Sequence, residues 1–155
     1  MVVADTSALI GAWHAHYPPA SIRGFWAFLD EAMHDGRVIV PSLVFDEIVE
    51  QSDGLSRWLR DRHQLVVPPG EDVQRFAGYL QATYRFAVGR DKADPFVIAE
   101  AHVRVFVVAT YEGRSPTGKT AKSKKDVDSM PTICKAEKIA CYQPAEAWAR
   151  AGLVM

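Results

Sequence analysis

The sequence predicts an α/β fold, a three-layer α/β/α sandwich around a central and mainly parallel sheet. Short apolar runs alternate along the chain with longer segments in which apolar residues recur every three or four positions. The runs 2–4 and 105–109 contain only apolar residues, as strands buried on both faces do. Acidic residues stand where strands are expected to give way to helices, and ligands bind at such turns in open parallel sheets.

The first half of the chain is expected to alternate between strands and helices. Asp35-Gly36 ends the first helical segment, because glycine commonly follows the last turn of a helix. Pro41 follows the second strand and opens a helix, since proline is favoured at the first helical position. The expected elements, in order, are a strand at Val2–Ala4, a helix at Ile22–Met33, a strand at Arg37–Val40, a helix from Pro41 that carries Glu47, and a helix at Leu55–Arg62.

The second half continues the same alternation. Its clearest helix has Val73, Phe76, Leu80 and Tyr84 on one face. The expected elements are a strand at Gln64–Val67, helices at Glu71–Phe86 and Asp94–Val103, a strand at Val105–Ala109, a strand at Ile139–Tyr142 and a helix at Pro144–Arg150. A polar, basic loop at about 113–130 lies too near the C-terminus to separate two domains, so we expect residues 1–155 to form a single domain.

Composition places the chain among ordinary globular proteins, with 48% hydrophobic and 24% charged residues. No apolar stretch approaches the roughly 20 residues that cross a bilayer, and the N-terminus has no apolar signal core. We therefore expect a cytoplasmic protein with no membrane partner. Cys134 and Cys141 have no Cys or His at zinc-site spacing, so buried free thiols are the expected state.

Charge is distributed unevenly between the two ends of the chain. Residues 1–112 hold 10 Lys+Arg and 15 Asp+Glu, a net charge of −5, and residues 113–155 hold 8 and 4, a net charge of +4. An acidic body beside a basic segment fits a metal site next to a polyanion contact, and it also fits ordinary surface variation.

Four acidic residues are the candidate catalytic and metal-binding residues: Asp5, Glu47, Asp94 and Glu112. If they converge at the carboxyl edge of the sheet, their oxygens would suit Mg²⁺ or Mn²⁺. Such metals support phosphodiester chemistry by polarising the phosphate and activating water. Hydroxyl groups of Thr6, Ser7 and Thr110 could hold metal-bound water. A structural alternative is that Asp5 and Asp94 only cap helices, because Asp is favoured at that position.

These motifs resemble those of the PIN domain nucleases, which include the VapC-like toxin ribonucleases. The resemblance is carried by Val-Val-Ala-Asp5-Thr-Ser-Ala-Leu-Ile, by Glu47 in Phe-Asp-Glu-Ile, by Asp94 in Lys-Ala-Asp-Pro-Phe-Val-Ile-Ala, and by Thr110 with Glu112. Together with His16-Tyr17-Pro18 and Pro131-Thr-Ile-Cys134, the motifs are similar to those of one bacterial branch of PIN-like proteins.

The resemblance implies a PIN-like sandwich and Mg²⁺- or Mn²⁺-dependent cleavage of RNA, with the toxin role of a toxin–antitoxin pair. It also implies a cognate antitoxin as partner, and a homodimer is a further expectation. Many relatives have an Asp two residues after the strand-ending Thr or Ser, where this chain has Glu112. Asp126 and Asp128 are therefore alternative fourth ligands.

Two other functions remain open from the sequence. One is a PIN-like module that binds RNA or protein without catalysis. The other is a nucleotide-binding phosphotransferase, because Gly113-Arg-Ser-Pro-Thr-Gly-Lys-Thr120 matches the phosphate-loop pattern. No apolar helical period follows that match, and 35 residues after Thr120 are too few for a nucleotidase core. The loop cations are better explained as contacts to RNA phosphates: Arg114, Lys119, Lys122, Lys124 and Lys125.

Overall fold

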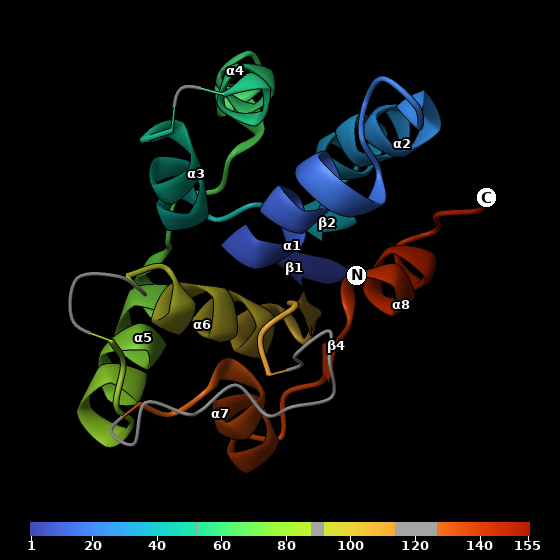
Figure 1. Cartoon of the computed structure of the whole chain (residues 1–155). Coiled ribbons are helices and arrows are strands. Elements are labelled where there is room, and N and C mark those ends of the chain that lie inside the picture. The colour runs from blue at the N-terminus through green and yellow to red at the C-terminus, as the bar shows by residue number, and fades with distance from the viewer. Residues whose placement is uncertain (52, 88–91, 114–126) are drawn as a thin grey trace.

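Four parallel strands form one sheet with helices on both faces (Figure 1). The computed structural model describes all of the chain except residues 52, 88–91 and 114–126. The strands are β1 (Val2–Ala4), β2 (Val38–Ile39), β3 (Val107–Ala109) and β4 (Cys141–Tyr142), and their order in the sheet is β2-β1-β3-β4. The predicted α/β fold with a parallel sheet is therefore confirmed.

The described α-helices are α1 (Thr6–Gly11), α2 (Arg23–His34), α3 (Ser42–Val49), α4 (Gly54–Arg60), α5 (Glu71–Thr83), α6 (Asp94–Arg104), α7 (Met130–Ala136) and α8 (Pro144–Arg150). A π-helical turn at Ala12–His16 continues α1, and a 3-10 turn at His63–Leu65 follows α4. In the part of the chain that the structure describes, no helix is long and apolar enough to cross a membrane.

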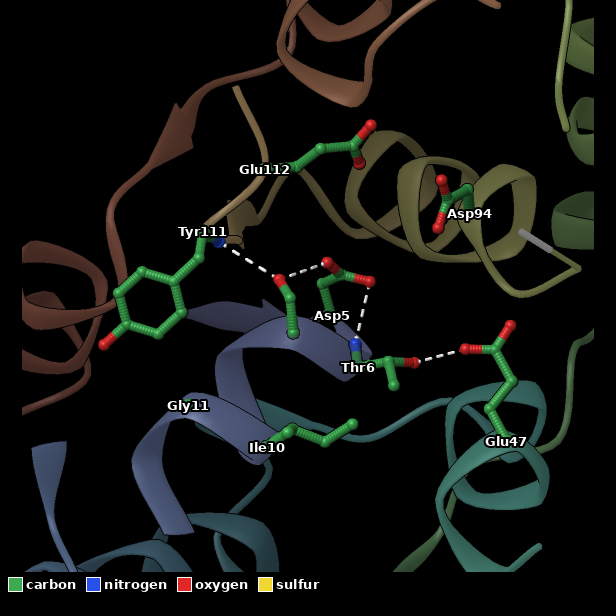
Figure 2. Close-up of a pocket in the computed structure, with 9 residues that line it drawn as sticks. Asp5, Thr6, Ile10, Gly11, Glu47, Asp94, Tyr111 and Glu112 are labelled. Atoms are coloured by element: carbon green, nitrogen blue, oxygen red, sulfur yellow. Dashed lines mark hydrogen bonds between the residues drawn. The ribbon is translucent and has the colours of Figure 1, made fainter. Parts of the chain in front are cut away.

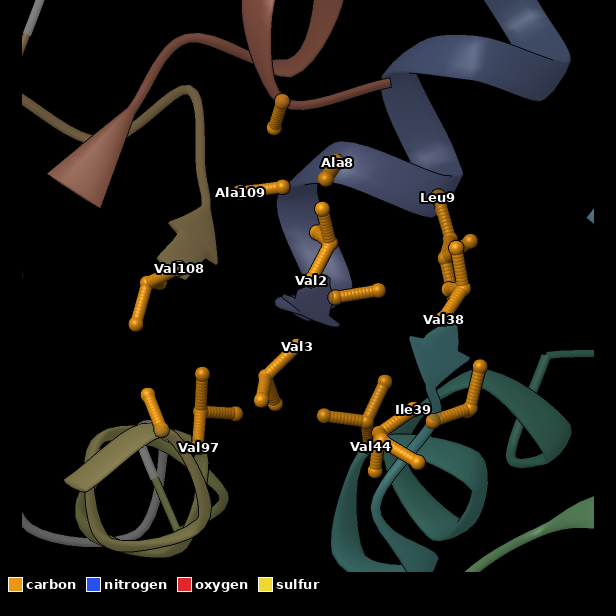
Figure 3. Close-up of a cluster of buried hydrophobic side chains, with 14 of the residues drawn as sticks. Val2, Val3, Ala8, Leu9, Val38, Ile39, Val44, Val97, Val108 and Ala109 are labelled. Carbon is orange, nitrogen blue, oxygen red and sulfur yellow. The ribbon is translucent and has the colours of Figure 1, made fainter. Parts of the chain in front are cut away.

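The core lies on both sides of the short sheet, because strand side chains alternate between its two faces. Val3 and Val108 are register partners, and Figure 3 shows them directed toward Val97 of α6. On the opposite face, Leu9 of α1 lies against Val38 of β2 (Figure 3). All of these side chains are buried. The core therefore fixes both the register of the strands and the positions of α1 and α6.

Topology places the start of α1 beside the end of β3. The chain passes from β1 to β2 on one side and later returns to β3 on the other side of β1. Asp5 N–H donates to the Ala109 carbonyl at 3.0 Å, so the pairing continues past both strand ends. A parallel sheet that changes direction in this way opens a crevice beyond the carboxyl ends of the two strands.

Two strand predictions were partly wrong. Gln64–Val67 was expected as a strand, but His63–Leu65 forms a 3-10 turn and only Val67 makes an isolated bridge, to Pro41. Pro68 and Pro69 follow, and proline has no N–H with which to extend a ladder. Val105 was expected in β3, but it is a left-handed residue that ends α6, with 90% of its surface exposed.

The helix α7 was not predicted, because its first residue was assigned to the polar loop. Ser129 caps it by accepting a hydrogen bond from Thr132 N–H at 3.3 Å, and Pro131 lies in its first turn. This Ser-Met-Pro sequence is an ordinary helix start, so the signal was present in the sequence. The predicted helix at 71–86 ends earlier, at Thr83, since Tyr84 has extended backbone angles.

Candidate functional site

A cleft of about 740 Å³ opens at the carboxyl ends of β1 and β3 (Figure 2). All four candidate acids line it, and each comes from a different part of the chain. Asp5 follows β1, Glu47 lies on α3, Asp94 begins α6 and Glu112 follows β3. The fold therefore gathers at one crevice carboxylates that lie far apart in the sequence.

Asp5 is held in one orientation by neutral donors from both sides of the crevice. It caps α1, with its Oδ1 accepting a hydrogen bond from Thr6 N–H at 2.8 Å. Its Oδ2 accepts hydrogen bonds from the Ser7 and Thr110 hydroxyls, each at 2.8 Å. Ser7 Oγ and Thr110 Oγ1 lie 3.2 Å apart, and Tyr111 N–H donates to Ser7 Oγ at 3.1 Å. The cap interpretation of Asp5 is correct, and it leaves the carboxyl group at the cleft.

Burying the charged carboxylate of Asp5 costs free energy. Only 4% of the residue is exposed, and no Lys or Arg among the described residues forms an ion pair with it. Burial raises the pKa of Asp5, and the hydrogen bonds from Ser7, Thr110 and Thr6 oppose that rise. A buried carboxylate that is compensated only by neutral donors favours a nearby cation.

Glu47 connects three elements of the cleft. Its Oε2 accepts a hydrogen bond from the Thr6 hydroxyl at 2.5 Å, and its Oε1 accepts one from Ala93 N–H at 3.0 Å. Ala93 is the residue before α6 and has no side-chain oxygen to cap the helix. The Glu47 carboxylate therefore satisfies backbone N–H where α6 begins, and this position also suits the positive end of the helix dipole.

Asp94 is the first residue of α6, and Pro95 follows it. The structural alternative had Asp94 as the N-cap of α6, but Ala93 occupies that position. Figure 2 shows the Asp94 side chain extending from the start of α6 into the cleft. The structural alternative for this carboxylate is therefore weaker than the sequence suggested.

The fourth acid in the cleft is Glu112. Its backbone N–H donates to Thr110 Oγ1 at 3.0 Å, and its Oε1 accepts a hydrogen bond from Met130 N–H of α7 at 3.4 Å. The alternative Asp128 accepts a hydrogen bond from the backbone N–H of Arg85, at 2.8 Å from its Oδ2. Asp128 does not line the cleft, and Asp126 lies outside the described residues.

The donor chemistry of the cleft fits Mg²⁺ or Mn²⁺, although the side chains do not form a ligand set as they stand. Carboxylate and hydroxyl oxygens are the donors that these ions prefer. Among the described residues, no three His, Cys, Asp or Glu side chains are close enough together to hold a metal ion. Both Glu47 oxygens are directed to Thr6 and Ala93. Side-chain rotation would be needed to bring the acids around one ion.

An aromatic wall of the cleft was not predicted from the sequence. Tyr111 lines the cleft and stacks on His16, with ring centroids 4.8 Å apart. Burial raises the pKa of Tyr111 to about 12, and the nearby Tyr17 adds to the rise. A Cβ on Gly11 would lie 2.5 Å from Tyr111 Cε2, so the ring occupies space that only glycine leaves. No pattern in the sequence indicates this contact, which joins residues 100 positions apart.

The predicted RNA-contact residues are outside the described part of the chain: Arg114, Lys119, Lys122, Lys124 and Lys125. The phosphate-loop match also lies outside the described residues, except for its first residue, Gly113. The first described helix after the match is α7, which begins at Met130. These interpretations of the loop therefore stay predictions.

Comparison with known structures identifies the class of fold as PIN-like. The chain is similar to one from the crystal structure of FitAcB from Neisseria gonorrhoeae, with 18% identity and a TM-score of 0.51. The similarity covers 94% of this chain and 99% of that one. The protein belongs to the family described as Domain of unknown function (DUF4411), whose model matches residues 2–155. Comparison with curated proteins gave no match.

Proposed function

We propose that the protein is a metal-dependent endoribonuclease that hydrolyses RNA phosphodiester bonds at this cleft. The observation that carries the proposal is the convergence of Asp5, Glu47, Asp94 and Glu112 from four elements on one open crevice. When bound, Mg²⁺ or Mn²⁺ would polarise the phosphate and supply an activated water. The PIN-like fold and the matching motifs support the same activity.

The residues of the chain have separate tasks in this proposal. Asp5, held by three neutral donors, presents a carboxylate of fixed direction. Glu47 fixes the start of α6 through Ala93 and thereby positions Asp94. Glu112 is the fourth acid of the cleft and lies across it from Glu47. The two hydroxyls on Asp5, from Ser7 and Thr110, keep it from rotating away from the cleft.

RNA as substrate and the toxin role rest on the resemblance to PIN domain nucleases. The net charge of +4 in residues 113–155 supports a polyanionic substrate. A cognate antitoxin would then be the natural protein partner, and a homodimer would be a second form of assembly. Coexpression with the product of an adjacent gene, followed by copurification, would test the antitoxin.

The nuclease proposal is tested by incubating purified protein with labelled single-stranded RNA in Mg²⁺, in Mn²⁺ or in EDTA. Cleavage is expected only with metal, and Asp94→Asn and Glu47→Gln are each expected to lower its rate by on the order of 100-fold or more. Asp46→Asn is the matched control, because Asp46 is exposed on α3 beside Glu47 but does not line the cleft. It should retain the wild-type rate.

The alternatives give different results in the same assay. A non-catalytic module would bind the RNA and leave it intact under every metal condition. A phosphate-loop enzyme would hydrolyse ATP and lose its activity in Lys119→Ala, because that lysine would contact the β- and γ-phosphates. Under the nuclease proposal, Lys119→Ala keeps most of the cleavage rate while Asp5→Asn loses nearly all of it.

A further inference from the structure

The cleft that holds the four acids has a second region with a different chemistry. Ile10, Gly11 and Tyr111 line it together with the carboxylates and hydroxyls. Tyr111 and Glu112 are consecutive residues after β3, but Figure 2 shows their side chains directed to different parts of the cleft. The Glu112 carboxylate extends toward α6, whereas the Tyr111 ring lies beside Gly11 of α1. One cavity of about 740 Å³ therefore joins an anionic region to an apolar, aromatic region.

The Tyr111 ring is held in place by contacts on several sides. Its backbone N–H donates to Ser7 Oγ at 3.1 Å, and the Ser7 hydroxyl donates to Asp5 Oδ2 at 2.8 Å. The ring stacks on His16, with centroids 4.8 Å apart and planes 25° apart. Its edge fills the space that Gly11 leaves by having no Cβ. A ring that is already fixed loses little conformational freedom when a ligand packs on it.

A nucleotide has the same two parts as the cleft. Its phosphate is an anion that a metal held by carboxylates would bind, and its base is a flat aromatic group that packs well on another ring. A cavity of about 740 Å³ is of the size that small-molecule sites usually have. Bases of single-stranded RNA are free to turn outward and stack on aromatic side chains, whereas the bases of a duplex are already paired and stacked. The two regions of the cleft therefore fit an unpaired nucleotide.

We propose that Ile10, Gly11 and Tyr111 form a nucleobase subsite, in which an unpaired base of RNA packs on the Tyr111 ring while the adjoining phosphate lies at the acids. This subsite rests on the proposed nuclease function, because both use the same cleft, and it adds the substrate class: single-stranded RNA. Stacking on a ring tolerates every base, because every base has an aromatic face. The subsite therefore selects unpaired RNA and does not select one sequence.

The test measures binding and not cleavage, so that it does not depend on nuclease activity. Fluorescence anisotropy gives the affinity of the full chain for a short single-stranded RNA and for a ribose–phosphate oligomer of the same length that lacks bases. Ca²⁺ is added to compensate the carboxylates, because it also prefers oxygen ligands, and a gel verifies that the RNA stays intact. The ratio of the two affinities isolates the contribution of the bases, since both ligands carry the same charge.

Wild type is expected to bind the RNA on the order of 10-fold more tightly than the baseless oligomer. Tyr111→Leu keeps an apolar side chain and removes the ring, so this ratio should fall toward one while the affinity for the baseless oligomer stays unchanged. Tyr111→Phe keeps the ring and should keep the ratio. Tyr79→Leu is the matched control and should behave as wild type, because Tyr79 is an exposed aromatic residue on α5 that does not line the cleft.

Two results would overturn the subsite: equal wild-type affinities for the two oligomers, and a ratio that persists in Tyr111→Leu. The wild-type comparison needs no variant, so it decides even if circular dichroism shows that Tyr111→Leu does not fold. The outcomes also separate the subsite from the nuclease. Metal-dependent cleavage by a wild type that binds both oligomers equally would remove only the subsite. Binding that depends on the bases and on Tyr111, without cleavage in any metal, would keep the subsite and remove the nuclease proposal.

Discussion

The Thr6 hydroxyl donates to the Glu47 carboxylate, which also accepts a hydrogen bond from Ala93 N–H. Thr6→Val removes this donor at nearly constant volume and leaves the Thr6 backbone N–H on Asp5 unchanged. Groups that orient metal ligands typically affect metal affinity by about 10–100-fold. We expect Thr6→Val to weaken activation by Mg²⁺ within that range, as measured by titrating the cleavage rate with metal.

Two controls separate loss of the hydroxyl from general damage. Thr6→Ser keeps the donor and should restore most of the metal affinity. Thr83→Val removes an exposed hydroxyl on α5 that bonds only to its own helix, through the Tyr79 carbonyl, and should leave activation unchanged. Equal metal affinity in Thr6→Val and wild type would show that this hydrogen bond does not orient Glu47 for metal binding.

The second prediction concerns how the stability of the fold depends on pH. It follows from Asp5, because burial raises the pKa of Asp5 in the folded state. The folded state then binds the proton more tightly than the unfolded state, so this group favours folding at low pH. That contribution is lost as pH rises from the ordinary value of 3.8 through the raised pKa. In EDTA, Asp5→Asn should therefore be more stable than wild type at neutral pH, and the difference should shrink as the pH falls toward 3.8.

Thermal unfolding with and without Mg²⁺ measures both parts of this prediction. Wild type should gain stability from Mg²⁺, since a cation compensates the buried carboxylate. Asp5→Asn should gain little, because Asn lacks the negative charge. Exposed Asp72 on α5 provides the control, and Asp72→Asn should follow wild type in both conditions. An Asp5→Asn protein that is less stable than wild type at neutral pH would contradict the assigned cost of burial.

The sequence identifies Asp5, Asp94 and Glu112 because each stands at a predictable strand or helix end, and it identifies Glu47 by its place within the helix that follows the second strand. Parallel strands bring such ends together, so Asp5, Glu47, Asp94 and Glu112 could be named before the structure. The hydrogen bond between Glu47 and Ala93, and the packing of Tyr111 against Gly11, could not. They depend on how helices pack and turn, and no local pattern encodes those distances.

At the scale of elements, the turn from α1 into the π-helix depends on the packing of Tyr111 against Gly11. The backbone of Gly11 is ordinary helix, with φ of −63°, so glycine is required by space and not by conformation. A Cβ there would lie 2.5 Å from the Tyr111 ring. We expect Gly11→Ala to destabilise the fold by about 1–3 kcal/mol, as overpacking commonly does, measured by urea denaturation.

The matched control is Gly24→Ala on α2, where nothing lies within 4 Å of the added carbon. It should be neutral or stabilising by up to about 1 kcal/mol, because alanine favours helix more than glycine does. In a Tyr111→Ala background, the cost of Gly11→Ala should largely disappear. If it persists there, the destabilisation comes from another contact and the aromatic wall does not set the position of α1.

Element boundaries show where local sequence patterns lose their predictive value. The helix Pro144–Arg150 is found at the predicted residues, since Pro144 marks its start. Val105 has high strand propensity but adopts a left-handed angle to end α6, because β3 must begin in register with Val2 at Val107. Tertiary pairing therefore decides a boundary that apolar character alone assigns to the strand.

At the scale of the whole molecule, the order β2-β1-β3-β4 explains why one crevice gathers residues from distant parts of the chain. The chain crosses β1 when it passes from β2 to β3. This crossing separates the helices that follow β1 from those that lead into β3. Alternating strands and helices predict a parallel sheet, but they do not predict strand order, which depends on packing among all the helices. The site could therefore be placed at the carboxyl edge from sequence, and its exact lining could not.

The last prediction concerns RNA binding and follows from the uneven charge of the chain. Residues 113–155 carry a net charge of +4, and four of their cations are Lys119, Lys122, Lys124 and Lys125. If these lysines bind RNA phosphates, replacing all four with Ala should weaken RNA binding. The slope of log affinity against log salt should also become shallower, by about 0.7 for each phosphate of single-stranded RNA that is no longer neutralised. Filter binding at several salt concentrations measures both quantities.

The control removes the same total charge elsewhere, by replacing four exposed helical arginines with Ala: Arg23, Arg57, Arg75 and Arg150. A long-range effect of net charge would lower affinity equally in both variants, whereas direct binding of phosphates would change the salt slope only in the lysine variant. Single-turnover cleavage of saturating RNA should be similar in the lysine variant and wild type, because the acidic cleft is intact. Equal salt slopes in the two variants would show that the loop lysines do not bind RNA.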